Sequence, residues 1–341
     1  MIPLRIAVAG AGQFGRRHME TIRNEPLAQL AAVADPALKE KLAVPCFADV
    51  REMLDKVKPE AVIIATPNQH HVSVGLACVE RRVPMLVEKP IAGTVEDSLT
   101  LVEAADRAGV PLLVGHHRRH NPLVEKAREM VQGGALGRIA AVSALWLLQK
   151  PAEYFDVAWR REAGGGPLLI NTIHDVDDLR FICGEIEEVR AMTSSSIRNF
   201  EVEDTAVLAL RFANGALGTL TVSDAVAAPW SWELASGEAA VYPPRQHEPC
   251  YFFSGTRGSL ALPAMDFWSY KGGKTGWYAP LSKEKIAVQG EDPQVRQLRH
   301  FIRVARGEEA PRTGGADATR TLATVLAVHK AAQTGGAVDT S

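Results

Sequence analysis

A lysine between a glutamate and a proline, Glu88-Lys89-Pro90, directly follows the apolar run 85–87. The apolar run predicts a short buried strand, so the lysine would stand at the strand's carboxyl end, where open α/β sheets bind their ligands. Proline restricts the backbone of the residue before it, which sets the direction of the Lys89 side chain. A lysine held beside a carboxylate in a partly dry site can donate and accept protons. Taken alone, the tripeptide also fits a surface lysine that ends a strand.

A glycine-rich turn near the amino terminus carries a second chemical signature. The apolar run 5–9 leads into Gly10-Ala11-Gly12-Gln13-Phe14-Gly15, a helix-compatible segment covers 16–23, and a second apolar run, 30–34, ends at Asp35. The order of strand, G-x-G-x-x-G turn, helix, strand and acid is typical of a dinucleotide-binding βαβ unit. The sequence therefore predicts a cofactor site at this turn.

Each glycine of the turn has a separate physical role. Gly10 permits the tight turn, Gly12 lets the backbone approach a pyrophosphate, and Gly15 lets helix and strand pack closely. Amide groups at the helix amino terminus, where Gln13 and Phe14 stand, are donors for the phosphates. We therefore assign these five residues to the cofactor site.

Asp35 bears on which dinucleotide binds. It stands about 20 residues past Gly15, where a carboxylate accepts hydrogen bonds from the adenosine ribose hydroxyls. A carboxylate at this place repels a 2′-phosphate, no arginine follows closely, and the nearest cation is Lys39. NAD is therefore favoured over NADP.

Strand-like and helix-like segments continue to alternate through the first third of the chain. The predicted helices are 49–57, 72–80 and 95–108, and the predicted strands are 61–65, 85–87 and 111–114. Apolar strands separated by helices indicate a parallel sheet. The loop Thr66-Pro67-Asn68-Gln69-His70-His71 follows one of these strands. The glycine turn, this loop and Glu88-Lys89-Pro90 would therefore share the carboxyl edge of one sheet.

Beyond a predicted helix over 122–132 the pattern changes. Runs with strand character cover 139–148, 188–193, 205–212 and 217–223, and Asn214-Gly215 is a strong hairpin signal between the last two. Strands without intervening helices imply a mostly antiparallel sheet. We therefore expect an α/β protein of two domains. An NAD-binding Rossmann domain with a doubly wound parallel sheet would cover 1–121, and an α+β substrate domain with a large open sheet would cover 122–341.

Length and composition agree with two globular domains. The chain has 341 residues, of which 46% are hydrophobic and 23% charged, and its net charge is -2. That charge gives no bulk attraction to nucleic acid or to an anionic membrane, and no apolar run approaches membrane length. The four cysteines lie far apart without a C-x-x-C pair, which disfavours a disulfide framework and fits a reducing cytoplasm.

The clusters of the first domain resemble those of the glucose–fructose oxidoreductase / inositol dehydrogenase / MocA family of NAD(P)-dependent oxidoreductases. The motifs that carry the resemblance are the early G-x-G-x-x-G, Thr66-Pro67-Asn68 with His71, and Glu88-Lys89-Pro90, and the likeness covers nearly the whole chain. It implies that Lys89 contacts both the nicotinamide end of the cofactor and the substrate, with Glu88 positioning it. It also implies a homodimer or homotetramer formed through the exposed face of the second domain's sheet.

A second chemical segment lies between the strand runs 139–148 and 188–193. The glycines 164–166 precede Pro167, from which the sequence predicts one helix. On that helix Asn171, His174 and Asp178 would share a face, because they are spaced at steps of three and four. A single histidine here also fits a structural role in the core.

The family pattern on this helix is an aspartate, a histidine four residues later, and another aspartate three further on. His174 and Asp177 match it, but Ile170 stands where the first aspartate is found. Asn171 next door would point about 100° around a continuous helix. The resemblance therefore implies a catalytic His174 without the aspartate-assisted proton relay of inositol dehydrogenases.

The basic run 115–122 ends the first predicted domain. Its histidines have no carboxylate or cysteine nearby in sequence, so a metal site is disfavoured. We expect this loop to face the cofactor or an acidic substrate group, with His116 assigned to the cofactor and Arg119 to the substrate.

The combined pattern predicts a cytosolic, NAD-dependent oxidoreductase that acts on a hydroxyl of a sugar, cyclitol or related polyol. Hydride would pass between the substrate carbon and nicotinamide C4, and the hydroxyl proton would move to or from Lys89 or His174. Trp159, Arg160 and Asn171 join Arg119 as candidates that hold the substrate.

Two alternatives stay open. The protein could use bound NAD without net turnover to break a glycosidic bond, as a hydrolase or lyase. The missing acid at Ile170 could instead mark a non-catalytic NAD-binding sensor. The aromatic, glycine-rich and proline-rich segment 229–280 is compatible with substrate walls or with core.

Overall fold

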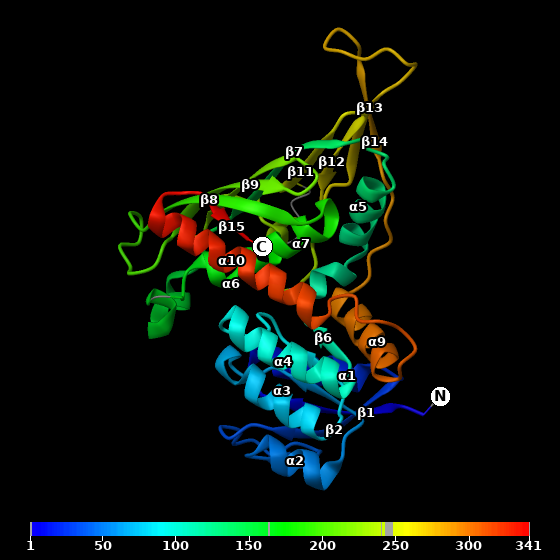
Figure 1. The fold of residues 1–341 in the computed structure, drawn as a ribbon, viewed down its shortest axis with the longest axis vertical. Helices are drawn as coiled ribbons and strands as arrows, with labels where there is room; N and C mark the ends of the chain where they lie inside the picture. Colours follow the sequence, from blue (N-terminus) through cyan, green and yellow to red (C-terminus); the bar gives the residue numbers. More distant parts are fainter. Residues whose placement is uncertain (1, 163, 240, 243–247, 341) are drawn as a thin grey trace. The chain divides into compact units, whose positions relative to one another are not determined.

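The computed structural model describes residues 2–162, 164–239, 241–242 and 248–340, which form two compact units (Figure 1). The first unit takes the chain up to His120 and then Glu291–Leu322. The second unit takes Asn121–Gly290 and the chain from Ala323 onward. We had expected all residues after 121 to belong to the second domain, whereas the chain returns to the first unit before its last helix ends.

The first unit is built on a six-stranded parallel sheet of order β3-β2-β1-β4-β5-β6. Its strands are β1 (Leu4–Ala9), β2 (Ala28–Ala34), β3 (Cys46–Phe47), β4 (Ala61–Ile64), β5 (Met85–Val87) and β6 (Leu112–Val114). Its helices are α1 (Gln13–Asn24), α2 (Val50–Val57), α3 (His71–Glu80), α4 (Val95–Ala108) and α9 (Pro293–Ala305), with short 3-10 turns η1 (Asn68–His70) and η2 (His117–His120). The order reverses between β1 and β4, which is the switch point where doubly wound sheets bind ligands.

Helix α9 explains why the chain returns to the first unit. Its residues Leu298, Phe301 and Ile302 are buried in one hydrophobic cluster with Ile6 of β1 and Ile22 of α1. The amphipathic pattern of α9 predicts a helix, but it does not say which sheet the apolar face will cover. Burial of that face against β1 and α1 makes α9 part of the Rossmann unit.

The second unit is built on a nine-stranded sheet of order β14-β13-β12-β11-β7-β10-β9-β8-β15. Its strands are β7 (Ile139–Leu147), β8 (Ile186–Ser194), β9 (Thr205–Phe212), β10 (Leu217–Ser223), β11 (Tyr251–Gly255), β12 (Gly258–Leu262), β13 (Asp266–Tyr270), β14 (Leu281–Lys285) and β15 (Val338–Asp339). Its helical segments are α5 (Pro122–Gln132), η3 (Ala152–Asp156), η4 (Ala158–Arg161), α6 (Pro167–Ile170), α7 (Thr172–Cys183), α8 (Trp232–Ala235) and the end of α10 (Gly315–Thr334). Within the described chain, the neighbouring strands pair antiparallel except β7 with β10. The hairpin predicted at Asn214-Gly215 joins β9 to β10, and Gly215 has the positive φ of 85° that such a turn requires.

One face of this sheet is covered and the other is open. Helices α5 and α7 and the end of α10 lie along one face (Figure 1) and share a core with the inward side chains of the strands. Residues of β9 alternate between buried and exposed, as a half-buried antiparallel strand should. The open face exposes Met192, Val207, Leu217 and Phe252.

The segment 229–280, which from its composition fits either substrate walls or core, supplies α8 and three strands on one side of the sheet. Trp232 and Tyr251 are buried, with stacked rings whose centroids lie 5.7 Å apart, whereas Trp277 and Tyr278 are exposed. Its residues 240 and 243–247 lie outside the described residues. Among the described residues, no helix has both the length and the apolar character of a membrane span.

Candidate functional site

The glycine turn between β1 and α1 contains two glycines that leave no room for a Cβ and one that faces open space. A Cβ on Gly10, whose φ is +95°, would lie 2.5 Å from the Ala65 carbonyl oxygen, and a Cβ on Gly15 would lie 2.0 Å from the Gly10 carbonyl oxygen. A Cβ on Gly12 would meet nothing within 4 Å. Gly12 is the N-cap of α1, so an open space adjoins the helix end that favours anions.

Asp35, at the end of β2, is tied to the glycine turn. Its Oδ2 accepts a hydrogen bond of 2.7 Å from the Ala11 amide, and its Oδ1 accepts one of 2.7 Å from the Ala37 amide. Each oxygen keeps a second lone pair. The carboxylate is thus fixed in direction and retains acceptor capacity for a pair of hydroxyls.

The carboxylate of Glu88, at the end of β5, is held by a histidine that the sequence analysis did not single out. His18 Nε2 lies 2.7 Å from Glu88 Oε1, and both side chains are buried. Burial opposes the charge of Glu88, but the His18 hydrogen bond and the charges of His18, His117 and Lys89 outweigh it and lower its pKa to about 2. A Cβ on Gly115 would lie 3.2 Å from this carboxylate, so the neighbouring strand leaves room for it. A histidine in the first turns of α1 is the only sequence signal for this pair.

Lys89 stands at the carboxyl edge that the sequence predicted. Its side chain is half-buried, the Lys89–Pro90 peptide bond is cis, and its ammonium lies 6.0 Å from the centre of the Phe14 ring. Phe14 is 44% exposed. Lys89, which follows β5, and the first turn of α1 therefore lie at the same edge of the sheet.

His71 braces two of the predicted cofactor loops. Its Nδ1 lies 2.8 Å from the Pro90 carbonyl and its Nε2 lies 2.9 Å from the Thr66 carbonyl. Burial lowers the pKa of His71, although both carbonyls favour its protonated form. The ring therefore ties the loop after β4 to the loop after β5. Thr66 Oγ1, close by in sequence, is buried and has no hydrogen-bond partner among the described residues.

The basic run 115–122 turns inward, which differs from the expectation that it faces ligands. Arg119 is 3% exposed and pairs with Asp317, while Arg312 donates 2.9 Å to the Arg119 carbonyl. His120 Nε2 lies 2.8 Å from His300 Nδ1, and burial lowers the pKa of His120 well below its ordinary value. The run thus anchors the returning segment Glu291–Leu322. His116 is buried as well.

No group of three or more potential metal ligands gathers within the portion of the chain that the structure describes.

The helix predicted from Pro167 is broken at Asn171. Helix α6 ends at Ile170, Asn171 is the N-cap of α7, and the His174 amide donates 3.0 Å to the Asn171 carbonyl. Angles counted along one continuous helix therefore do not apply across Asn171. Asn171 is half-buried, whereas the side chains of α7, including His174 at 9% exposure and Asp178 at 0%, are buried.

Trp159 and Arg160 lie in η4 of the second unit. The Arg160 guanidinium stacks 4.0 Å from the Tyr154 ring centre and donates 2.8 Å to the Tyr154 carbonyl. Trp159 is 51% exposed. Arg160 is therefore held by its own loop, and Trp159 remains available to a ligand.

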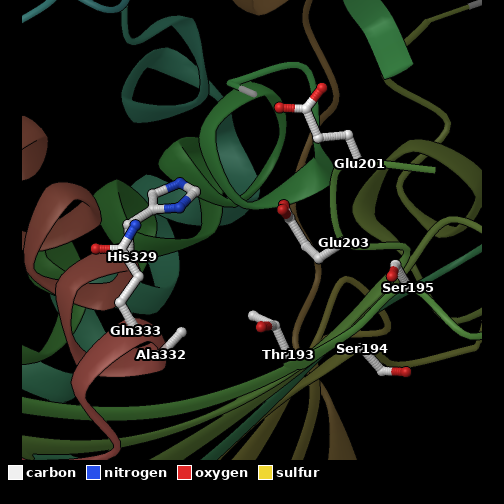
Figure 2. A pocket seen from close by; sticks show the side chains of 8 residues that line it. All are labelled: Thr193, Ser194, Ser195, Glu201, Glu203, His329, Ala332 and Gln333. Carbon is white, nitrogen blue, oxygen red and sulfur yellow. The ribbon is translucent and has the colours of Figure 1, made fainter. Parts of the chain in front are cut away.

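A separate polar groove of about 330 Å³ lies beside the end of β8 (Figure 2). The Glu203 carboxylate and the His329 ring point into the same hollow. Glu203 Oε1 accepts 2.9 Å from the Leu168 amide, so this carboxylate caps the start of α6. Neither Lys89 nor His174 lines the groove.

Comparison with known proteins gives matches on both halves of the chain. Residues 4–116 match the model of the oxidoreductase family with an NAD-binding Rossmann fold, and residues 124–261 match the GFO/IDH/MocA C-terminal domain. The myo-inositol 2-dehydrogenase of Thermotoga maritima is 31% identical over 64% of this chain and 67% of its own. The chain belongs to the GFO/IDH/MocA family of oxidoreductases.

Other relatives extend the match along the chain. The D-apiose dehydrogenase of Paraburkholderia graminis is 28% identical over 98% of this chain and 88% of its own, whereas the match to the rhizopine catabolism protein MocA of Rhizobium meliloti (30% identical over 54% of this chain) spans 59% of that protein. The WlbA dehydrogenase of Bordetella pertussis, crystallised with NADH and UDP-GlcNAcA, has the same fold, with a TM-score of 0.79 at 24% identity and 99% and 98% of the two chains covered.

The first unit fits the NAD that this family binds. Gly12 opens onto space at a helix amino terminus, Asp35 presents fixed acceptors, and the buried hydroxyl of Thr66 is unused by the described residues. An open helix amino terminus suits a pyrophosphate, and fixed carboxylate acceptors suit a ribose diol.

Proposed function

We propose that the chain is an NAD-dependent dehydrogenase that transfers hydride between nicotinamide and a hydroxyl-bearing carbon of a sugar, cyclitol or related polyol. The observation that carries the proposal is the carboxyl edge of the Rossmann sheet, where the open Gly12, the fixed Asp35 and Lys89 belong to one edge. The names of the inositol, apiose and levoglucosan dehydrogenases among the relatives support this substrate class.

The residues have separate roles in this proposal. Bound NAD would accept the hydride. Lys89 and His174 would move or stabilise the proton of the substrate hydroxyl, and the ionised Glu88 would hold Lys89 in place. Arg119 leaves the set of substrate contacts because its guanidinium is buried against Asp317. His71 serves as a brace between cofactor loops.

The proposed cofactor preference rests on Asp35. A carboxylate whose two oxygens are already aligned by the Ala11 and Ala37 amides would accept ribose hydroxyls and repel a 2′-phosphate. We expect tighter binding of NAD than of NADP, and a smaller gap in Asp35→Ser, by titration calorimetry. Equal affinity for the two cofactors in the unmodified protein would contradict the assignment.

The substrate class is tested by incubating the protein with NAD and a panel of cyclitols, aldoses, sugar acids and glycosides. A dehydrogenase makes NADH in step with product. A redox-neutral hydrolase or lyase makes product without NADH, and a sensor makes neither. Only the first outcome supports the proposal.

We also propose that the protein works in the cytoplasm as a homodimer or homotetramer. Among the described residues the cysteines form no disulfide, with Cys46 exposed and Cys78, Cys183 and Cys250 buried, which suits a reducing compartment. The open face of the nine-stranded sheet exposes apolar side chains that a second copy would cover.

A further inference from the structure

Lys150, just after β7, is a buried cation that none of the roles above uses. It is 9% exposed, and its ammonium donates 2.9 Å to Asn171 Oδ1 and lies 3.3 Å from Asp224 Oδ2. The Tyr154 ring centre is 4.6 Å away. A buried ammonium is unfavourable unless its partners compensate for the lost water, so its place beside Asn171 needs a reason.

Neutralising Asp224 is not that reason. Arg198 Nε donates 3.1 Å to Asp224 Oδ1, and Arg198 also bonds to the Asp224 carbonyl. The carboxylate therefore has a cation of its own without Lys150. Burial lowers the pKa of Lys150, and the charges of Asp224 and Glu233 oppose that shift. The contact through which Lys150 reaches the corner between α6 and α7 is the one to Asn171.

This contact fixes which way the Asn171 carboxamide faces. An ammonium has donors and no acceptor, so it must meet the amide oxygen, and the amide nitrogen must point elsewhere. The Asn171 backbone is used in the corner between α6 and α7. Its Nδ2 makes no hydrogen bond within residues 2–340 as far as the structure describes them, and the residue is half-buried.

We propose that Asn171 and Lys150 form a substrate subsite, in which Asn171 Nδ2 donates to an acceptor oxygen of the substrate and Lys150 is the positioning residue. The inference rests on the proposed function and deepens it. Ile170, next to Asn171, has no polar side chain. The donor that this corner offers is therefore the Asn171 carboxamide, whose direction is set by Lys150. The chemistry favours polyols that present a hydroxyl, carbonyl or carboxylate oxygen there. A group that can only donate would be disfavoured.

The test is a double-mutant cycle on the full-length protein with NAD and the best substrate of the panel. Asn171→Ala should raise KM about tenfold, the usual scale for losing one hydrogen bond to a ligand. Lys150→Met should raise KM several-fold, and the double variant should be no worse than Asn171→Ala, because Lys150 acts through Asn171. Lys150→Arg, which keeps only donors, should restore much of the loss. NAD affinity and kcat should change little.

Three results would overturn the subsite. KM could stay unchanged in both single variants, the two effects could multiply in the double variant, or Lys150→Met could weaken NAD binding as much as it raises KM. Because Arg198 still pairs with Asp224, we expect Lys150→Met to fold, which thermal unfolding checks. Asn24→Ala, on an exposed helix end, is the matched control.

A second readout does not depend on turnover. In protein labelled with ¹⁵N-asparagine, the side-chain amide signal of Asn171, assigned by its loss in Asn171→Ala, should move in Lys150→Met and stay in the surface control Lys285→Met. An unmoved signal in Lys150→Met would overturn the inference even if no panel member is oxidised. Absence of NADH with every panel member would overturn the proposed function alone.

Discussion

At the scale of single residues, the glycine turn contains one glycine that we assign to cofactor binding, Gly12, and one that the fold requires, Gly15. Gly12→Val places its Cβ where nothing lies within 4 Å, so the fold should hold while NAD affinity falls at least tenfold. Gly15→Ala forces a Cβ to 2.0 Å from the Gly10 carbonyl, so stability should fall by roughly 1–3 kcal/mol. Calorimetric NAD binding and thermal unfolding of both variants distinguish the roles. A Gly12→Val protein with full NAD affinity would show that the turn only supports the fold.

Glu88 gives a residue-scale prediction about pH. Its pKa is about 2 in the folded chain and 4.5 ordinarily, so its ionisation stabilises the fold fully above pH 4.5 and the contribution is lost as pH falls towards 2. Between pH 6 and pH 3 the unfolding free energy of the unmodified protein should drop by ~2 kcal/mol more than that of Glu88→Gln. Urea unfolding at the two pH values measures this, and parallel losses in the two proteins would refute it.

At the scale of elements, the sequence predicted best where local signals and packing agree. Helix α4 was predicted at its observed bounds, because Thr94 caps its start and Gly109, with a φ of +65°, ends it. The break between α6 and α7 could not be predicted in this way. Asn171 has a helical backbone and no proline follows it, so the helical periodicity of the sequence continues across the break. The inward turn of the basic run was equally hidden, because its partners Asp317 and His300 lie far along the sequence.

The two candidate proton-transfer groups, Lys89 and His174, lie on different kinds of element, so we expect their substitutions to have different effects. Lys89 ends a strand with its neighbour Glu88 fixed by His18, whereas His174 lies in the first turn of α7 with Ile170 in place of the family's aspartate. We expect Lys89→Met to lower turnover by about a hundredfold, with NAD affinity within about tenfold, and His174→Ala mainly to raise KM. Steady-state kinetics of both variants decide it. An active Lys89→Met beside a dead His174→Ala would make the histidine the base.

At the scale of the whole molecule, the sequence indicated two units but not the path between them. The change from alternating segments to consecutive strands lies close to His120, where the long segment of the first unit ends, because parallel and antiparallel sheets need different connections. The return of the chain to the first unit over Glu291–Leu322 has no comparable signal in the sequence. It depends on which sheet buries Leu298, Phe301 and Ile302, and that is decided by tertiary packing. Likewise His18 and Lys150 gain their importance only from partners brought close by folding.

The open face of the nine-stranded sheet gives the prediction at this scale. Met192 of β8 lies directly opposite Val207 of β9, and Leu217 of β10 lies on the same exposed face. Single exposed apolar residues are ordinary, but the cross-strand pair Met192 and Val207, with Leu217 further along the same face opposite Arg211, forms a surface that a second copy can cover. If it does, Val207→Glu combined with Leu217→Glu places buried charges at the interface and should shift the protein towards monomer in light scattering. Leu99→Glu, at a comparably exposed site on α4, is the control and should leave the mass unchanged. An unmodified protein that is monomeric at micromolar concentration, or a double variant that keeps the oligomer's mass, would place any assembly elsewhere than on this face.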